Sequence, residues 1–242
     1  MRLERKIGFY EKYTKRLLDI ACSILFIIAF CWLYAIIAVV VRIKMGSPVI
    51  FKQPRPGIVK NGKETIFDMF KFRSMTDERD ENDELLSDEK RLTKFGAFLR
   101  STSLDELPEV FSILKGDMSI VGPRPQLVRD MVFMSDQQRM RHTAKPGLSG
   151  LAQVKGRNAI TWEEKLDWDI KYIEKVNFLN DVKILFQTVA AVFMRNGITD
   201  GENATALDYG ETLLKAGKVS KLQYDELQTY AKTLIKEHER KN

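Results

Sequence analysis

The longest apolar run of the chain lies near its N-terminus. From Ile20 to Val41, 21 of 22 residues are apolar, and Ser23 is the exception. As a straight helix this run would be about 33 Å long, close to the roughly 30 Å thickness of the hydrocarbon core of a bilayer. It is too long for the apolar part of a secretory signal, and no small-x-small cleavage site follows it. The pattern therefore predicts a membrane-inserted helix.

Basic residues flank the apolar run on both sides. Six Lys or Arg residues precede it, and six more follow it before the next acidic residue, Glu64. Because cytoplasmic flanks are enriched in Lys and Arg, this charge pattern favours a helix that enters the bilayer, bends and leaves by the same face. Bending usually needs Pro or Gly, and residues 29–33, in the middle of the run, contain neither. The residues alone leave a re-entrant and a spanning helix both open.

The polar body that follows begins with strand patterns. Asn61-Gly62, between residues 58–60 and 65–67, predicts a β-hairpin with a two-residue turn. Residues 70–73 alternate, so two phenylalanines share one face of a strand while Lys71 and Arg73 share the other. Such a strand is either an ordinary half-buried strand with solvated cations or an anion-binding face.

A helix is predicted just after residue 103. Apolar residues at helical spacing form one stripe that stops before Gly116: Leu107, Val110, Phe111 and Leu114. Asp105 and Glu106 then lie at or just before the helix N-terminus. Ser103 and Glu106 match a capping box. The alternative is a carboxylate nucleophile placed where helix amides hold a phosphate, with Arg100 and Arg124 supplying the balancing charge.

Further along the chain, single motifs are weaker signals. In residues 122–125, Gly-Pro-Arg-Pro, two prolines stiffen the backbone around Arg124, as in a rigid turn or in a guanidinium site for phosphate. Arg157 ends a Gly-Arg corner. An apolar stripe from Val182 to Phe193 predicts a helix that belongs either to the core or to a membrane interface. Residues 204–237 indicate two short amphipathic helices.

Composition narrows the chemistry. The net charge of +6 over 242 residues suits anionic membranes, nucleic acid or phosphorylated substrates alike. Cys22 and Cys31 both lie in the apolar run, too far apart on a helix for a disulfide, so a disulfide framework and a structural zinc cluster are excluded. His142 and His238 are the only histidines, which argues against His-based triads. No P-loop, Rossmann or HExxH motif is present.

Taken in order, the motifs resemble those of a known family. The chain resembles the small monotopic phosphoglycosyl transferases among the bacterial sugar transferases, over about residues 10–198, and most of all the bacillosamine-type enzymes of protein glycosylation. The motifs that carry this resemblance are residues 15–19, 51–57, 70–75, 103–108, 114–119, 121–125 and 146–158. Where family members usually have a Ser-Pro break in the apolar run, this chain has Cys31-Trp32.

The resemblance implies a reaction. Family members move a phospho-sugar from a UDP-sugar to a polyprenol phosphate such as undecaprenyl phosphate and release UMP. By this likeness Asp105 is the nucleophile, which forms an aspartyl-phosphosugar intermediate and holds Mg²⁺, and Glu106 is its partner. The basic residues expected to cradle phosphates are Lys71, Arg73, Arg100, Arg124 and Arg157. The expected sugar is an N-acetylated amino sugar.

The resemblance also implies an architecture. We expect an α/β fold that is mostly helical with a small β-hairpin, a re-entrant membrane helix and amphipathic helices at the interface. The expected parts are a membrane-inserted segment (residues 1–45), a catalytic domain (46–200) and a polar helical tail (201–242). The protein is then expected at the bacterial inner membrane, in contact with its lipids, with the active site on the cytoplasmic face.

A function of a different class competes with this one. The chain could be a membrane-tethered basic protein that binds lipid headgroups or RNA without catalysis, with tight and salt-sensitive binding. Its aromatic residues fall in apolar stripes rather than between basic residues, which argues against a nucleic-acid platform. We therefore expect no nucleic-acid partner.

Overall fold

The computed structural model describes residues 5–156, 160–193 and 207–241, and for Val192 and Phe193 it describes the backbone alone. The described part is mostly helical with two small sheets, which confirms the predicted fold class. The strands are β1 (Ile50–Lys60), β2 (Lys63–Phe72), β3 (Ser119–Val121) and β4 (Gly147–Ser149). The longer α-helices are α1 (Lys15–Met45), α3 (Lys94–Ser101), α8 (Trp162–Glu174), α9 (Phe178–Phe193) and α11 (Lys221–Glu239). Shorter ones are α2 (Asp88–Arg91), α4 (Glu109–Lys115), α5 (Val128–Met131), α6 (Asp136–Arg139), α7 (Leu151–Gly156) and α10 (Tyr209–Lys215). Single turns of other helix types are η1 (Tyr10–Thr14), η2 (Leu104–Glu106) and η3 (Met140–Thr143).

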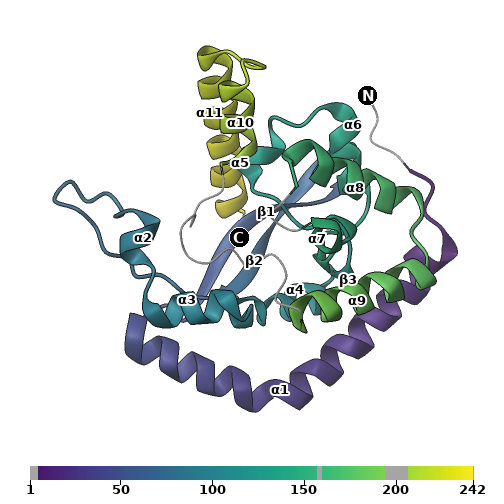
Figure 1. The fold of residues 1–242 in the computed structure, drawn as a ribbon, viewed down its shortest axis with the longest axis horizontal. Helices are drawn as coiled ribbons and strands as arrows, with labels where there is room; N and C mark the ends of the chain where they lie inside the picture. The colour runs from purple at the N-terminus through teal and green to yellow at the C-terminus, as the bar shows by residue number, and fades with distance from the viewer. Residues whose placement is uncertain (1–4, 157–159, 194–206, 242) are drawn as a thin grey trace.

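Helix α1 contains the apolar run and is bent. Figure 1 shows it as an unbroken helix that bends near its middle, with the rest of the molecule on the concave side. Near this point the indole N–H of Trp32 donates to the carbonyl of Ala29 over 3.1 Å, and a side chain that enters the backbone ladder is one known cause of bending. The helix is long and apolar enough to cross a membrane, and 11% of its most apolar 18-residue window is buried in the protein.

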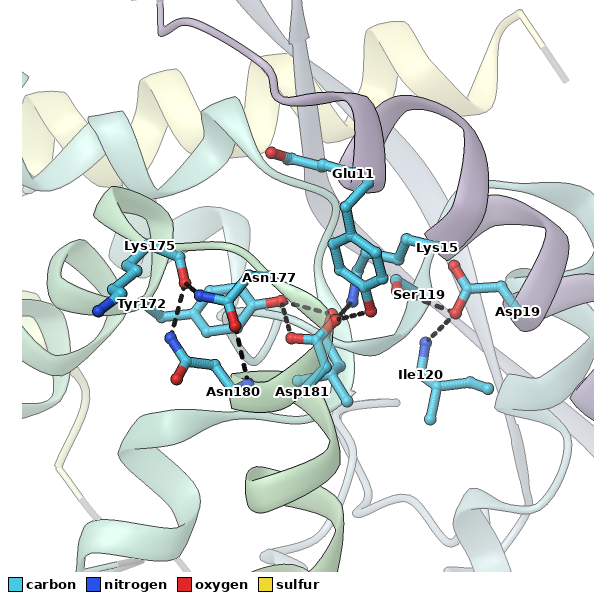
Figure 2. A network of polar contacts seen from close by, with 12 residues as sticks. Glu11, Lys15, Asp19, Ser119, Ile120, Tyr172, Lys175, Asn177, Asn180 and Asp181 are labelled. Carbon is cyan, nitrogen blue, oxygen red and sulfur yellow. Dashed lines mark hydrogen bonds and ion pairs between the residues drawn. The ribbon is translucent and has the colours of Figure 1, made fainter.

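The N-terminal part of α1 is held by polar contacts. The Lys15 ammonium pairs with the Asp181 carboxylate, which also accepts hydrogen bonds from the hydroxyls of Tyr10 (2.8 Å) and Tyr172 (2.9 Å). Figure 2 shows these groups converging on Asp181, and beside them Asp19, which accepts from the Ser119 hydroxyl and from the main-chain N–H that follows it. These contacts fix the start of α1 to α8, α9 and β3.

The C-terminal part of α1 is held by apolar packing instead. Ile37, Val41 and Met45 are buried against Phe72 of β2 and Leu99 of α3. Both ends of α1 therefore rest on the same body. A straight helix that crossed a bilayer could not return to a body on one side, so this geometry fits a monotopic anchor.

The β1–β2 hairpin confirms the predicted two-residue turn. Lys60 pairs with Lys63, and Asn61 and Gly62 have φ angles of 53° and 76°, as a type I′ turn requires. The strands are longer than the sequence pattern predicts, because β1 continues through Pro54 and Pro56. The hairpin brings Lys71, near the end of β2, next to α4 and η2.

A second, parallel pair of strands positions the loop after β3. Val121 pairs with Ser149, and the N–H of Gly122 donates to the carbonyl of Ser149 over 2.8 Å. The backbones are so close that a Cβ on Gly147 would lie 2.0 Å from the nitrogen of Gly122. Only glycine permits this approach. The loop that carries Arg124 therefore starts from a rigid base.

Two helices with predicted apolar stripes expose part of the stripe instead of burying all of it in a core. In α4, Val110 and Ile113 are buried, whereas Phe111 is exposed and its ring lies 5.7 Å from that of Tyr34 in α1. In α9, the stripe residues Leu185, Phe186 and Val189 are exposed, and Ile184 is the buried apolar residue instead. Because α9 runs along the inner side of the bent α1 (Figure 1), the exposed stripe suits a membrane interface, which was one of the two predicted alternatives.

The C-terminal segment contains the two predicted helices, α10 and α11, which begin after the gap in the described residues. They lie side by side against the hairpin and α5 (Figure 1). Tyr209 and Leu213 pack with Phe133 and Leu166, and Ala231 packs with Met131. The segment is thus integrated with the body by apolar contacts, and the predicted boundary at residue 200 lies outside the described residues.

Candidate functional site

The candidate site is built around η2, the turn that carries Asp105 and Glu106. Ser103, just before this turn, has a φ of 55° and makes no capping hydrogen bond through its side chain. The capping-box interpretation of Ser103 and Glu106 is therefore wrong: in the left-handed conformation the serine cannot serve as an ordinary N-cap. The carboxylate of Glu106 is used elsewhere. The predicted helix splits into η2 and α4 around Pro108.

Glu106 lies between two cations from distant parts of the chain. Its Oε1 is 2.8 Å from Nζ of Lys71, at the end of β2, and 2.5 Å from Nη2 of Arg124, in the loop after β3. The structure thus brings together three of the residues that the sequence selected. The hairpin, η2 and the parallel strand pair each contribute one of them.

The electrostatics of this cluster keep Glu106 ionised. Burial opposes ionisation, but the charges of Arg124 and Lys71 outweigh it and hold the pKa of Glu106 well below its usual range. In turn the Glu106 carboxylate raises the pKa of Arg124. Arg124 therefore remains charged beside a charged Glu106. The side chain of Arg124 is still 38% exposed, so it can contact a ligand from solvent.

Asp105 behaves differently from its neighbour. It is 7% exposed, and among the described residues no side chain forms a hydrogen bond or ion pair with its carboxylate. Burial raises the pKa of Asp105, and the negative charge of Glu106 adds to this, while Lys71 and Arg100 act in the opposite direction. Asp105 and Glu106 thus form a dyad of two different carboxylates. The charge of Glu106 is balanced by two cations, whereas the carboxylate of Asp105 is free to react or to bind a cation.

The other predicted phosphate ligands lie in different surroundings. Arg100, in α3, donates to the hydroxyl of Ser74 over 2.9 Å and acts on Asp105 through its charge. The guanidinium of Arg73 donates to the main-chain carbonyls of Ser47 and Met75 and pairs with Asp77, so it supports the backbone and does not join the cluster. Arg157 lies outside the described residues.

Two further charged residues of the cluster were not selected from the sequence. Glu109, 2% exposed, places Oε1 3.3 Å from Nζ of Lys71, and burial followed by the charge of Glu106 raises its pKa. Arg55, in β1, donates to the carbonyl of Pro125 over 3.0 Å. Burial and the nearby charge of Arg124 lower the pKa of Arg55 to about 10. The position of Glu109 one turn after Asp105 was a signal that could have marked it.

The site adjoins the long apolar helix α1. The hydroxyl of Tyr34, in α1, donates over 2.6 Å to the carbonyl of Leu107, the residue that follows Glu106. Leu107 also packs against the cluster formed by α1, β2 and α3. Asp105 and Glu106 therefore lie close to the point where α1 packs on the body.

Comparison with known proteins identifies the family of this chain. A family described as bacterial sugar transferase matches residues 10–195, which include every described residue of the cluster. The chain belongs to the bacterial sugar transferase family. It is 46% identical over 192 residues to the sugar transferase EpsL of Bacillus subtilis, covering 79% of this chain and 93% of EpsL.

Two other relatives of this sugar transferase are much longer proteins. It is 39% identical to the galactosyl transferase CpsE of Streptococcus agalactiae over 78% of its length, but spans only 45% of CpsE. It is 36% identical to the undecaprenyl-phosphate galactose phosphotransferase of Salmonella typhimurium over 77% of its length, and spans 42% of that protein. The shared part is therefore less than half of each of these relatives.

The carboxylates at the site of this sugar transferase fit one mode of Mg²⁺ binding. Among the described residues, no group of three or more His, Cys, Asp or Glu side chains could hold a metal ion on its own. Mg²⁺ is often held by one or two carboxylates together with substrate phosphates and water. The unpaired carboxylate of Asp105 suits this mode, whereas Glu106 is already occupied by two cations.

Proposed function

We propose that this sugar transferase moves a phospho-sugar from a UDP-sugar to undecaprenyl phosphate and releases UMP. The observation that carries the proposal is the dyad: an unpaired, buried Asp105 beside a Glu106 that holds Lys71 and Arg124. The names of relatives support the reaction class, since they include an undecaprenyl-phosphate galactose phosphotransferase and a UDP-glucose:undecaprenyl-phosphate glucose-1-phosphate transferase.

In the proposed first step, the Asp105 carboxylate attacks the β-phosphorus of the UDP-sugar. A bond forms between the carboxylate oxygen and phosphorus, and the bond from phosphorus to the bridging oxygen breaks, so that UMP leaves with the electron pair. In the second step, an oxygen of undecaprenyl phosphate attacks the same phosphorus and releases the carboxylate. The covalent intermediate lets two substrates of opposite solubility react in turn at one group.

The neighbours of Asp105 have distinct roles in this proposal. Lys71 and Arg124 bind the diphosphate, and a guanidinium can hold two phosphate oxygens at once. Glu106, held ionised by these cations, keeps them in place and is not a proton carrier. Arg100 adds positive charge beside Asp105 and favours its reactive, ionised form. Mg²⁺ bound at Asp105 would neutralise charge on the diphosphate.

We propose that the protein lies at the cytoplasmic face of the bacterial inner membrane with α1 as a re-entrant helix. Two features support this: both ends of α1 rest on one body, and both flanks of the apolar run are basic. A cytoplasmic site would meet the soluble UDP-sugar from one side and undecaprenyl phosphate from the bilayer. It would start a glycan on the lipid, as a first membrane step of assembly.

For the sugar we propose an N-acetylated amino sugar, on the resemblance to bacillosamine-type enzymes. Relatives named for galactose and glucose make these two sugars the necessary comparison. A panel of UDP-sugars with undecaprenyl phosphate and Mg²⁺, assayed for UMP release, ranks the candidates by kcat/KM. Preference for UDP-glucose or UDP-galactose would overturn the choice of sugar and leave the reaction class intact.

The decisive experiment replaces the nucleophile. In Asp105→Asn the amide cannot form the intermediate, so UMP release should fall by about a thousandfold or more, the scale seen when a covalent nucleophile is removed. Asp117→Asn, a partly exposed acid outside the dyad, is the matched control and should keep near-normal turnover. In the wild type without acceptor, mass spectrometry should find phospho-sugar on Asp105. Substantial turnover by Asp105→Asn would refute the mechanism.

A further inference from the structure

A buried arginine outside the dyad holds the backbone of the loop that presents Arg124. Arg141, in η3, is 1% exposed, and its Nη2 donates to the carbonyl oxygen of Arg124 over 2.6 Å. The two prolines beside Arg124 have no N–H, so this stretch cannot pair as a regular strand; the carbonyl of Pro123 accepts from the main-chain N–H of Gly147 over 3.0 Å, whereas that of Arg124 accepts from a side chain. Arg141 supplies one of these donors.

Arg141 is itself fixed from behind. Its Nε and Nη2 lie 2.9 and 2.6 Å from one oxygen of Asp169, in α8, which is also 1% exposed. A buried guanidinium bound to a buried carboxylate has few other orientations, because leaving the pair would strand both charges. A chain of contacts therefore runs from α8 through Asp169 and Arg141 to the backbone of Arg124.

The chain of contacts continues into the site. From this anchored backbone the Arg124 side chain reaches Glu106, with Nη2 and Oε1 2.5 Å apart. The side chain of Arg124 is 38% exposed, so contacts along the side chain fix its position only in part. The position of its backbone then decides where the charge lies, and Arg141 is the side chain that holds the Arg124 carbonyl itself, while Arg55 holds the next carbonyl, that of Pro125.

We propose that Arg141 is a positioning residue that, held by Asp169, sets the place of the Arg124 guanidinium for the diphosphate of the UDP-sugar. This inference rests on the proposed function. Arg141 does not touch the substrate; it acts through the main chain of Arg124. Small misplacements of a binding group are costly in catalysis, about a hundredfold for 1 Å. The competing explanation is a buried ion pair that only stabilises the fold.

The test is a double-mutant cycle between Arg141→Lys and Arg124→Lys. Lysine lacks the fork needed to reach Asp169 and the carbonyl together. In otherwise wild-type enzyme, Arg141→Lys should lower kcat/KM for the UDP-sugar by about tenfold and raise its KM, while the KM for undecaprenyl phosphate stays within about twofold. In the Arg124→Lys background the same change should have an effect of less than about twofold.

The KM values distinguish a positioning role from a purely stabilising ion pair. Loss of fold stability alone lowers the amount of active enzyme, and so kcat, with both KM values unchanged and with effects that multiply in the double variant. That result would overturn the positioning role. Arg139, in the neighbouring helix α6, donates to both carboxylate oxygens of Glu64 in β2, and Arg139→Lys removes this two-point contact; this variant is the matched control and should leave the KM for the UDP-sugar unchanged.

A second variant covers the case in which Arg141→Lys does not fold. Asp169→Asn keeps the size of the side chain and one acceptor oxygen, and it should raise the KM for the UDP-sugar in the same direction, again only when Arg124 is present. If both KM values stay at the wild-type level in Asp169→Asn, the proposal is wrong. A wild-type enzyme that releases no UMP from any UDP-sugar would instead refute the proposed function, so the two failures are distinct.

Discussion

The attachment of α1 at Asp181 predicts a large and specific loss of stability. In Asp181→Asn the side chain keeps its shape and can still accept from Tyr172, but the ammonium of Lys15 loses its counter-ion. The side chains of this pair are 11% and 5% exposed, so the remaining charge is poorly solvated. Breaking a buried ion pair by removing one partner costs about 3–5 kcal/mol.

This loss of unfolding free energy can be converted into a shift of the melting temperature. For a chain of this size, each kcal/mol lowers Tm by about 2–4 °C, so Asp181→Asn should melt about 6–20 °C below the wild type. The assay is thermal unfolding in nanodiscs, followed by tryptophan fluorescence. Asp225→Asn, which breaks the exposed pair with Lys221, is the matched control and should shift Tm by no more than about 2 °C.

A rescue variant makes the reasoning refutable. In Lys15→Met combined with Asp181→Asn, the uncompensated ammonium is gone, the amide oxygen still accepts from the Tyr172 hydroxyl, and Asp19 keeps its hydrogen bonds from Ser119 and Ile120. At least half of the lost stability should return. Two results would contradict this reasoning: Asp181→Asn melts within about 2 °C of the wild type, or the double variant melts below the Asp181→Asn single variant. In either case the buried ion pair does not hold the start of α1.

Three further predictions follow from the site. The midpoint of the acid limb in the pH profile of kcat/KM should lie above pH 3.8, the ordinary pKa of an aspartate. Burial raises the pKa of Asp105, and only its ionised form attacks the phosphorus. A midpoint below pH 3.8 would contradict the assignment of Asp105 as the nucleophile. Arg73→Lys should lower stability by about 1–3 kcal/mol and leave the KM for the UDP-sugar within about twofold, since its guanidinium binds main-chain carbonyls; a large rise in KM would restore the phosphate role predicted from the sequence. Gly147→Ala should cost about 1–3 kcal/mol and lower kcat/KM through the Arg124 loop, whereas Gly8→Ala, which meets no atom within 4 Å, should do neither.

Local signals predicted the elements that depend on neighbours in sequence. The turn at Asn61-Gly62 demands positive φ angles, which few other residue pairs provide, so the hairpin was readable. The apolar run of α1 was equally plain. Lys71 and Arg124 were selected because their charges stood between apolar or rigid neighbours, and Glu106 because it follows Asp105 at a predicted helix N-terminus; the structure brings the three together.

Long-range contacts were beyond the reach of the sequence pattern. The alternating pattern puts Arg73 on the same strand face as Lys71, yet its guanidinium turns to the main-chain carbonyl of Ser47, which no local pattern reveals. Arg141 and Asp169 stand 28 residues apart and meet only after folding. The apolar stripe of α9 gave the helix but not its surroundings, because a face toward lipid and a face toward core have the same composition.

The contacts of α1 also fix an order of events during synthesis. Arg16 caps the end of α4 by donating to carbonyls 97 and 98 residues ahead, and the partner of Lys15 lies 166 residues ahead. The ribosome therefore releases α1 long before the residues that hold its start exist. Until then the helix has only lipid to cover its apolar surface, so the nascent chain is tethered to the bilayer first. The catalytic body then folds at the membrane, onto a helix that is already there.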